Sequence, residues 1–157
     1  MVKQNKLFLP AYLGVFVSSL AKHVAELTLF MHETNQDNSA DYLLEDKNIS
    51  FVSLGIKTSF FNRVFFNKSI LKEKMKLISD KDYLLIRSPS PLAPFFPKYS
   101  KIKVVYLIVG DYFETAKTQK ITSIRSFFSK YLTFYVDILL RKQLITNHVI
   151  VNSPLIQ

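Results

Sequence analysis

The chain has 157 residues, 48% of them hydrophobic, and no cysteine, a composition that fits one globular domain (1–157) and excludes a disordered or disulfide-framed protein. Its longest strongly apolar stretch, 132–140, is far shorter than the ~20 residues that a membrane-spanning helix requires. A net charge of +9 favours anionic partners, such as nucleotide phosphates, lipid phosphates or an anionic membrane surface. The lack of cysteine favours a cytoplasmic location, with any membrane contact peripheral.

The cationic residues are unevenly distributed along the chain. Between 26 and 46 every charged side chain is acidic, whereas 57–76 and 98–130 are dominated by Lys and Arg. We therefore expect one side of the molecule to be basic. An ordinary solvated basic surface without a specific partner is the alternative.

The first third of the chain contains one clear helical pattern. Phe16, Leu20 and Val24 recur every four residues, with Val17 and Ala21 beside them, which predicts a helix with one buried stripe. Short apolar runs bounded by polar residues predict strands around it. In chain order, the expected elements are a strand remnant at 7–9, the helix at 15–25, a strand at 27–31, a loop at 35–39 and a strand at 49–54.

The rest of the chain alternates between helical and strand patterns. Ser69 is expected to cap a helix that extends to Ile78 and buries Leu71, Met75 and Ile78. Four prolines between 89 and 97 exclude a long helix there. The expected elements are the helix at 69–78, strands at 82–87 and 103–109, a long helix at 123–142, a strand at 148–151 and the start of a helix at 153–154.

The runs 82–87 and 103–109 are almost continuously apolar, which is typical of buried parallel strands. The whole order predicts an α/β fold with a Rossmann-like, doubly wound, mainly parallel sheet and helices on both faces. At the carboxyl ends of these two runs stand the segment 87–91 and the dipeptide Gly110-Asp111. Because ligands of open α/β sheets bind at the carboxyl edge, the candidate site lies there.

Three kinds of side chain at strand ends are candidates for a site. The Arg87 guanidinium could bind a phosphate or carboxylate through two hydrogen bonds, and a salt bridge across the sheet edge is its alternative. Gly110 could let a substrate approach the backbone while Asp111 accepts a sugar hydroxyl or orients a base, the alternative being a structural Asx turn. His32, with Glu33 after the strand 27–31, could act as an acid or base, although an exposed histidine often has no role.

No metal or cofactor is predicted. His23, His32 and His148 have no metal-ligand spacing with one another or with carboxylates. The chain also has no P-loop, no full dinucleotide-binding fingerprint and no serine nucleophile elbow.

The long helix at 123–142 has two interpretations. Its aromatic and aliphatic residues, combined with Arg125, Lys130 and Arg141, could form a membrane-surface helix. Those apolar residues spread widely around the helix axis, so burial between the sheet and an absent partner domain is the other interpretation, and we favour it. In that case, removing the partner would expose the helix at Phe127, Phe128, Tyr131 and Tyr135.

The order of these motifs resembles the N-terminal domain of GT-B glycosyltransferases, particularly family 4. The resemblance covers most of the chain. The motifs that carry it are, in chain order, Tyr12-Leu-Gly14 before the helix 15–25, Asp82-Tyr-Leu-Leu-Ile-Arg-Ser-Pro89, Val109-Gly-Asp111, the long helix and His148-Val-Ile-Val-Asn-Ser153. It implies an acceptor-binding domain whose partner, a second Rossmann-like domain or subunit, binds the sugar nucleotide. Gly14 would then lie near the donor phosphates, and Arg87, Ser88 and Gly110 near the acceptor.

The activity that this resemblance implies is hexosyl-type transfer from a nucleotide sugar to a hydroxyl of a glycan or lipid-linked acceptor, with Asp111 and His32 as catalytic candidates. A chain that supplies only the acceptor side would be a truncated or split enzyme, inactive alone. The alternative is a non-catalytic α/β binding module that docks a protein or an anionic membrane through its basic face. Nucleic-acid binding is disfavoured because the aromatic residues have core spacing and the basic residues form no recognition motif.

Overall fold

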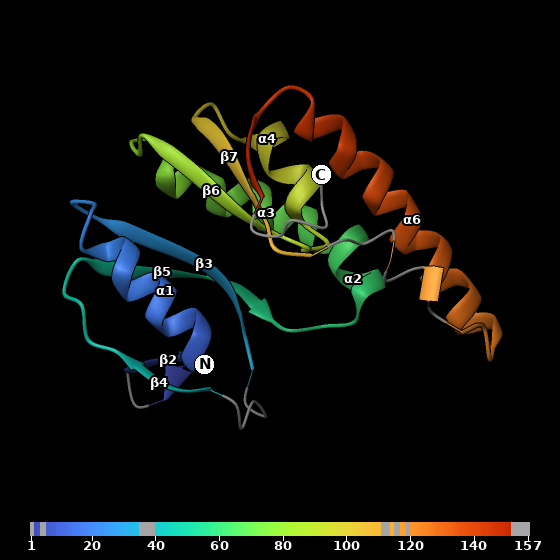
Figure 1. Ribbon diagram of the computed structural model, residues 1–157, viewed down its shortest axis with the longest axis horizontal. Helices are drawn as coiled ribbons and strands as arrows, with labels where there is room; N and C mark the ends of the chain where they lie inside the picture. The colour runs from blue at the N-terminus through green and yellow to red at the C-terminus, as the bar shows by residue number, and fades with distance from the viewer. Residues whose placement is uncertain are drawn as a thin grey trace. The chain divides into compact units, whose positions relative to one another are not determined.

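The computed structural model describes residues 2–3, 6–34, 40–110, 114, 117–118 and 120–151 (Figure 1). The chain divides into two compact units, Met1–Lys57 and Thr58–Gln157, and each is described separately here. Whether the two form the single domain expected for 1–157 stays a prediction. The loop expected at 35–39 and the helix start expected at 153–154 lie outside the described residues.

The first unit contains one antiparallel and one parallel sheet. Its elements are β1 (Val2–Lys3), β2 (Lys6–Pro10), α1 (Ala11–Ala21), β3 (Leu27–Glu33), β4 (Ala40–Leu44) and β5 (Ile49–Ile56). Strands β1, β2 and β4 pair antiparallel in that order, and β3 pairs with β5 in parallel. The predictions of strands at 7–9, 27–31 and 49–54 are confirmed, whereas β4 was not predicted.

Helix α1 begins and ends four residues earlier than predicted. It starts directly after Pro10, whose fixed φ suits a helix start, and Asn48 donates hydrogen bonds from its side chain to the Ala21 and Val24 carbonyls after the last turn. Its buried residues include Val17 and Ala21, as predicted, but Phe16 is 40% exposed and Val24 is also exposed. The buried face of α1 is therefore rotated around the helix axis relative to the predicted face, because α1 packs on β4 and β2.

The second unit contains a parallel sheet and several helices. Its elements are α2 (Phe60–Phe65), α3 (Asn67–Lys74), η1 (Met75–Ile78), β6 (Tyr83–Ser88), η2 (Ala93–Phe95), α4 (Phe96–Tyr99), β7 (Lys103–Ile108), α6 (Ile124–Leu144) and β8 (His148–Val151). Strands β6, β7 and β8 are parallel and adjacent in that order, which confirms the predicted parallel pair.

Strands β6 and β7 are buried on one face only, which corrects the expectation that the runs 82–87 and 103–109 are buried on both faces. Leu84 and Ile86 of β6 are buried, as are their register partners Val104 and Tyr106 of β7. The intervening Leu85 of β6 is exposed. Because successive side chains of a strand point to opposite faces, alternate residues leave the core even in a continuously apolar run.

The helix predicted at 69–78 is divided differently in the structure. Ser69 lies inside α3 and donates its hydroxyl hydrogen bond to the Phe66 carbonyl, so its predicted capping role is wrong. The observed cap in this region is Ser59, which accepts a hydrogen bond from the Asn62 backbone at the start of α2. The predicted burial of Leu71, Met75 and Ile78 is confirmed.

Helix α6 confirms the predicted long helix. Ser123 and Ser126 form a reciprocal capping box at its start, and the predicted end at 142 is two residues short. Thr133, Val136, Asp137 and Leu140 make up its buried face. Asp137 on this face accepts a hydrogen bond from Arg141 Nε at 2.6 Å, so the buried carboxylate is paired one turn along the helix.

The fold is therefore α/β with parallel strand pairing, in three small sheets within the described residues. Strand β2, which precedes the first helix, pairs with β1 and β4 in an antiparallel sheet and not with a parallel strand. None of the described helices combines the length and the apolar character needed to cross a membrane.

Candidate functional site

The two predicted loops meet at the carboxyl edge of β6 and β7. Ser88 and Ile108 are register partners at the ends of these strands, and the Val109 amide donates a hydrogen bond to the Ser88 carbonyl at 2.9 Å. Just beyond, a Cβ atom added at Gly110 would lie 3.2 Å from Pro89 Cδ. The structure thus brings the segment after β6 against the segment after β7, as parallel pairing requires.

The two predicted binding residues of β6 lie on opposite faces of the sheet. The Arg87 side chain is exposed, whereas Ser88 is fully buried and adjoins Ile108 in the core. Within the described part of the chain, the Ser88 hydroxyl has no hydrogen-bond partner. Arg87 can therefore reach a ligand in solvent, while Ser88 can contribute to the site only by shaping the backbone at the strand end.

Gly110 has a steric reason to be glycine. Contacts of 3.0–3.4 Å are tighter than ordinary packing, so a side chain at this position would press on the Pro89 ring. The Pro89 ring beside the Gly110 backbone keeps this part of the edge narrow. Asp111, the predicted general base, lies outside the described residues.

His32 lies at the carboxyl end of β3 in the first unit. Its Nδ1 is 3.3 Å from the Gly55 carbonyl of the paired strand β5, to which it donates when Nδ1 carries the proton. The backbone amide of Lys57 donates to the Glu33 carbonyl at 2.8 Å, which fixes the strand end beside the histidine. The site residues that the structure brings together are Arg87, Ser88 and Gly110, and His32 belongs to the other compact unit.

Gly14 lies inside helix α1 and not before the helix, which corrects the prediction for this residue. It is the fourth residue of α1 and is buried against Tyr42 of β4. A Cβ atom at position 14 would overlap the Tyr42 ring and lie 2.8 Å from Tyr42 Cβ. The close contact between helix and strand accounts for glycine here without a bound phosphate.

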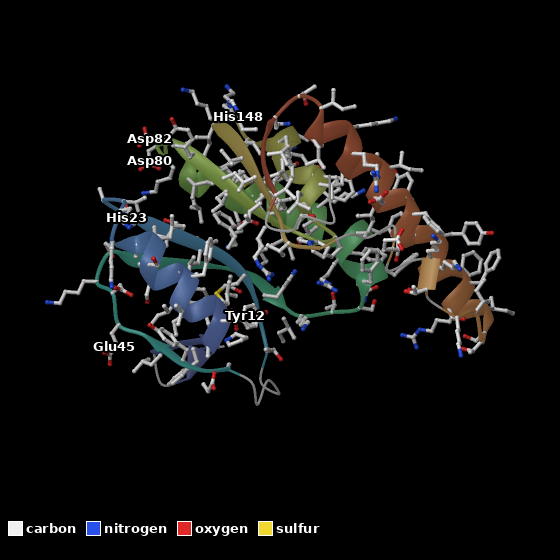
Figure 2. The ribbon with its side chains drawn as sticks, viewed as in Figure 1. Tyr12, His23, Glu45, Asp80, Asp82 and His148 are labelled. Atoms are coloured by element: carbon white, nitrogen blue, oxygen red, sulfur yellow. The ribbon has the colours of Figure 1, made fainter. Side chains whose placement is uncertain are left out.

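The residues at the opposite edge of the β6–β8 sheet are also polar. Asp82 precedes β6 and His148 begins β8, so both lie toward the amino ends of these parallel strands (Figure 2). Asp82 is separated from Arg87 by most of the length of β6, whereas His148 is paired with Val105 in the middle of β7 and belongs to a strand that is not adjacent to β6. Among the described residues, no group of three His, Asp or Glu side chains is arranged to hold a metal ion.

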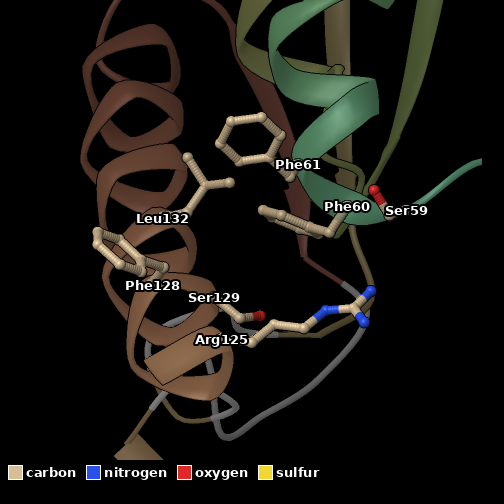
Figure 3. Close-up of a pocket in the computed structure, with 7 residues that line it drawn as sticks. All are labelled: Ser59, Phe60, Phe61, Arg125, Phe128, Ser129 and Leu132. Atoms are coloured by element: carbon tan, nitrogen blue, oxygen red, sulfur yellow. The ribbon is translucent and has the colours of Figure 1, made fainter. Parts of the chain in front are cut away.

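A pocket in the second unit was missed by the sequence analysis. It has a volume of about 450 Å³ and lies between the start of α2 and the first half of α6 (Figure 3). Its lining residues are Ser59, Phe60, Phe61, Arg125, Phe128, Ser129 and Leu132. The spacing of the four α6 residues, i, i+3, i+4 and i+7, marks one helix face in the sequence, but nothing local identifies 59–61 as the opposite wall.

The outer face of α6 is apolar and open. The expected exposure along this helix is confirmed for Phe127, Phe128, Tyr131 and Tyr135. Phe127 packs against Phe128 and Tyr131, with ring centroids 5.9 and 4.4 Å apart, so these rings form a continuous cluster. The opposite face of the helix lies in the core, and burial of this outer face against a partner domain stays a prediction.

Comparisons with protein-family models, with curated proteins and with solved structures found no match for this chain.

Proposed function

We propose that the chain is the acceptor-side half of a glycosyltransferase that moves a sugar from a nucleotide sugar to a hydroxyl acceptor. The observation that carries this proposal is the shared carboxyl edge of β6 and β7, where an exposed Arg87 stands beside the narrow Gly110 segment. The proposal includes a Rossmann-like, doubly wound sheet. The parallel pairings of β3 with β5 and of β6, β7 and β8 support it.

In this proposal each candidate residue has a separate task. Arg87 binds a phosphate or carboxylate of the acceptor, and Gly110 lets the acceptor approach the backbone. Asp111 takes the proton as the acceptor hydroxyl oxygen bonds to the sugar carbon. The bond from that carbon to the nucleotide diphosphate breaks, and the diphosphate leaves with the electron pair. A second domain or subunit holds the nucleotide sugar, so the chain is inactive alone.

The test is to co-express the chain with the product of the neighbouring reading frame and to measure transfer from a panel of nucleotide sugars by mass spectrometry. We expect product only from the complex. Arg87→Gln lowers the rate by about tenfold or more, because it removes a charge-assisted contact. Lys103→Gln removes a cation from the amino edge of β7 and leaves the rate unchanged. Turnover by the purified chain alone would contradict the view of it as half an enzyme.

The second candidate is a binding module that docks on an anionic membrane. The open aromatic face of α6 favours it, because Phe128 and Tyr135 are combined there with Arg125 on the same helix. Vesicles with and without phosphatidylglycerol, sedimented with the protein at low and high salt, test this candidate. If cationic side chains dock the protein on the membrane, it binds the anionic vesicles and this binding weakens as the salt concentration rises. Apolar self-association of the protein would instead persist at high salt.

A further inference from the structure

The pocket between α2 and α6 has one polar and one apolar end. Figure 3 shows Ser129 and the Arg125 side chain at one end and Phe61 and Leu132 toward the other, with Phe60 between them. All of these residues belong to the second unit. The pocket therefore offers a ligand a charged contact and an apolar surface a short distance apart.

The apolar end of the pocket leaves large rings in contact with water. Phe61 is 54% exposed and Phe128 is 64% exposed, although both line the pocket. Neighbouring rings hold them in place, since Phe61 lies 4.6 Å from Phe65 and Phe128 lies 5.9 Å from Phe127, measured between centroids. A hydrocarbon or aryl group in the pocket would remove this surface from water at little cost in side-chain order.

The polar end of the pocket is suited to an anion. Arg125 makes no ion pair or hydrogen bond with any described residue, although its guanidinium can bind an oxyanion through two hydrogen bonds. It lies in the first turn of the 21-residue helix α6, a turn without acidic residues, so the helix dipole adds positive potential there. The pocket lining contains no carboxylate to compete with a bound anion.

We propose that this pocket binds one anionic amphiphile, a molecule with a phosphate or carboxylate head and an apolar body. The head contacts Arg125 and Ser129, and the body lies among Phe60, Phe61, Phe128 and Leu132. A membrane lipid and a free phosphate monoester share this chemistry. The inference does not depend on glycosyl transfer, because none of these residues belongs to the carboxyl edge of β6 and β7.

The experiment uses the full chain and dodecyl phosphate below its micelle concentration, with binding measured by titration calorimetry. Arg125→Gln is expected to weaken binding about tenfold or more, because it removes the charge-assisted contact. Ser129→Phe fills the pocket and is expected to weaken binding to a similar degree or more, with circular dichroism as the check of its fold. Lys142→Gln, which removes a cation from the same helix outside the pocket, is expected to leave affinity within about twofold.

Two further arms distinguish the ligand sources and test the charge requirement. Dodecyl maltoside has the same apolar chain without the anion and is expected to bind at least about tenfold more weakly than dodecyl phosphate. If Arg125→Gln and Ser129→Phe reduce binding to phosphatidylglycerol vesicles, the ligand is a membrane lipid. If the two variants reduce only the binding of monomeric dodecyl phosphate, the ligand is a free amphiphile. Failure of dodecyl phosphate to bind, or equal binding by wild type and both pocket variants, would overturn the proposal.

Discussion

The two compact units differ in how completely they cover their parallel strands. In the second unit, Ile86 of β6 and Tyr106 of β7 are buried in the core, and Tyr106 is fully inaccessible. In the first unit, every residue of the apolar strand β3 is only half-buried. Strands β3 and β7 have similarly apolar sequences, so composition does not explain why β7 is more deeply buried than β3.

The helices next to each sheet explain it. In the second unit η2 packs against both β6 and α6, which places a helical layer beside the sheet. In the first unit α1 packs mainly on β2 and β4, while β3 and β5 chiefly contact each other. An apolar run thus determines that a strand forms and pairs, whereas its burial depends on which surface the neighbouring helix covers.

The largest expected effect contrasts the covered and open faces of α6. Val136 is fully buried and Ile138 is 55% exposed on the same helix. Val136→Asp should lower the free energy of unfolding by at least about 4 kcal/mol, because it buries an unpaired carboxylate. Ile138→Asp should change it by no more than about 0.5 kcal/mol. Urea unfolding followed by circular dichroism measures both.

If Val136→Asp leaves no folded protein to titrate, Val136→Ala supplies a graded measurement of the same contact. Its expected cost is about 2 kcal/mol, from lost burial and the cavity that remains. Equal costs for Val136→Asp and Ile138→Asp would show that the outer face of α6 is covered in solution, in contradiction to the contrast described above.

The second prediction compares the two parallel sheets directly by hydrogen exchange. Strand β7 is paired on both sides, whereas β3 and β5 form a two-stranded sheet. Amides such as that of Tyr106 should exchange about a hundredfold more slowly than that of Leu29, because local opening costs less where fewer side chains are buried. Mass spectrometry of peptides from β3 and β7 measures the ratio. Equal protection would show that the two units open as one cooperative structure.

Local sequence patterns predicted most strands and the long helix correctly. The runs at 82–87, 103–109 and 148–151 formed adjacent parallel strands, and α6 begins within one residue of the expected start at 123. Strand β4 was missed because its sequence has a weak alternating pattern and its pairing with β2 is non-local. Helix α2 was not predicted at all, and α3 begins two residues before the predicted start at Ser69.

The candidate site was predictable only as far as strand geometry determines it. Parallel pairing placed Arg87 and Gly110 at a common edge, as expected. The same geometry buries Ser88, since it follows Arg87 in the strand and points to the opposite face. The contact of Gly14 with Tyr42 depends on the packing of α1 on β4, and the pocket depends on the packing of α2 against α6. Neither contact leaves a local signal.

A third prediction tests the close packing in the less buried unit. In an open helix interior, Gly14→Ala would stabilise by about 1 kcal/mol through helix propensity. Here the added Cβ overlaps Tyr42, so the substitution should instead cost about 1 to 3 kcal/mol. In urea unfolding, a loss of stability on Gly14→Ala therefore indicates the close contact between Gly14 and Tyr42.

Two controls separate the contact from the helix propensity. Ser19→Ala, on the exposed face of α1, should change stability by no more than about 0.5 kcal/mol. In a Tyr42→Gly background, which removes the Tyr42 Cβ as well as the ring, the clash is absent, so Gly14→Ala should become stabilising, and the double-mutant cycle gives the coupling. A stabilising Gly14→Ala in the wild-type background would mean that α1 and β4 are not packed this closely.

The smallest expected effect concerns the phenol at the centre of the better covered sheet. Tyr106 donates a hydrogen bond to the Ala93 carbonyl at 3.0 Å, which ties β7 to η2. Tyr106→Phe should cost about 1 kcal/mol at pH 8, because the buried carbonyl loses its partner. Burial also raises the pKa of the Tyr106 phenol above its ordinary value of 10.0.

This pKa shift gives the Tyr106→Phe effect a direction with pH. Above pH 10 the unfolded chain releases the phenol proton while the folded chain retains it, so the unfolded state binds fewer protons and wild-type stability falls as pH rises. The phenylalanine variant lacks this proton, and all other groups titrate in both proteins. The stability difference between them should therefore move by about 1.4 kcal/mol in favour of the phenylalanine variant between pH 8 and pH 11, which makes that variant the more stable one at pH 11. Urea unfolding at the two pH values measures it, and a difference that stays constant would indicate that water reaches the Tyr106 hydroxyl in the folded protein.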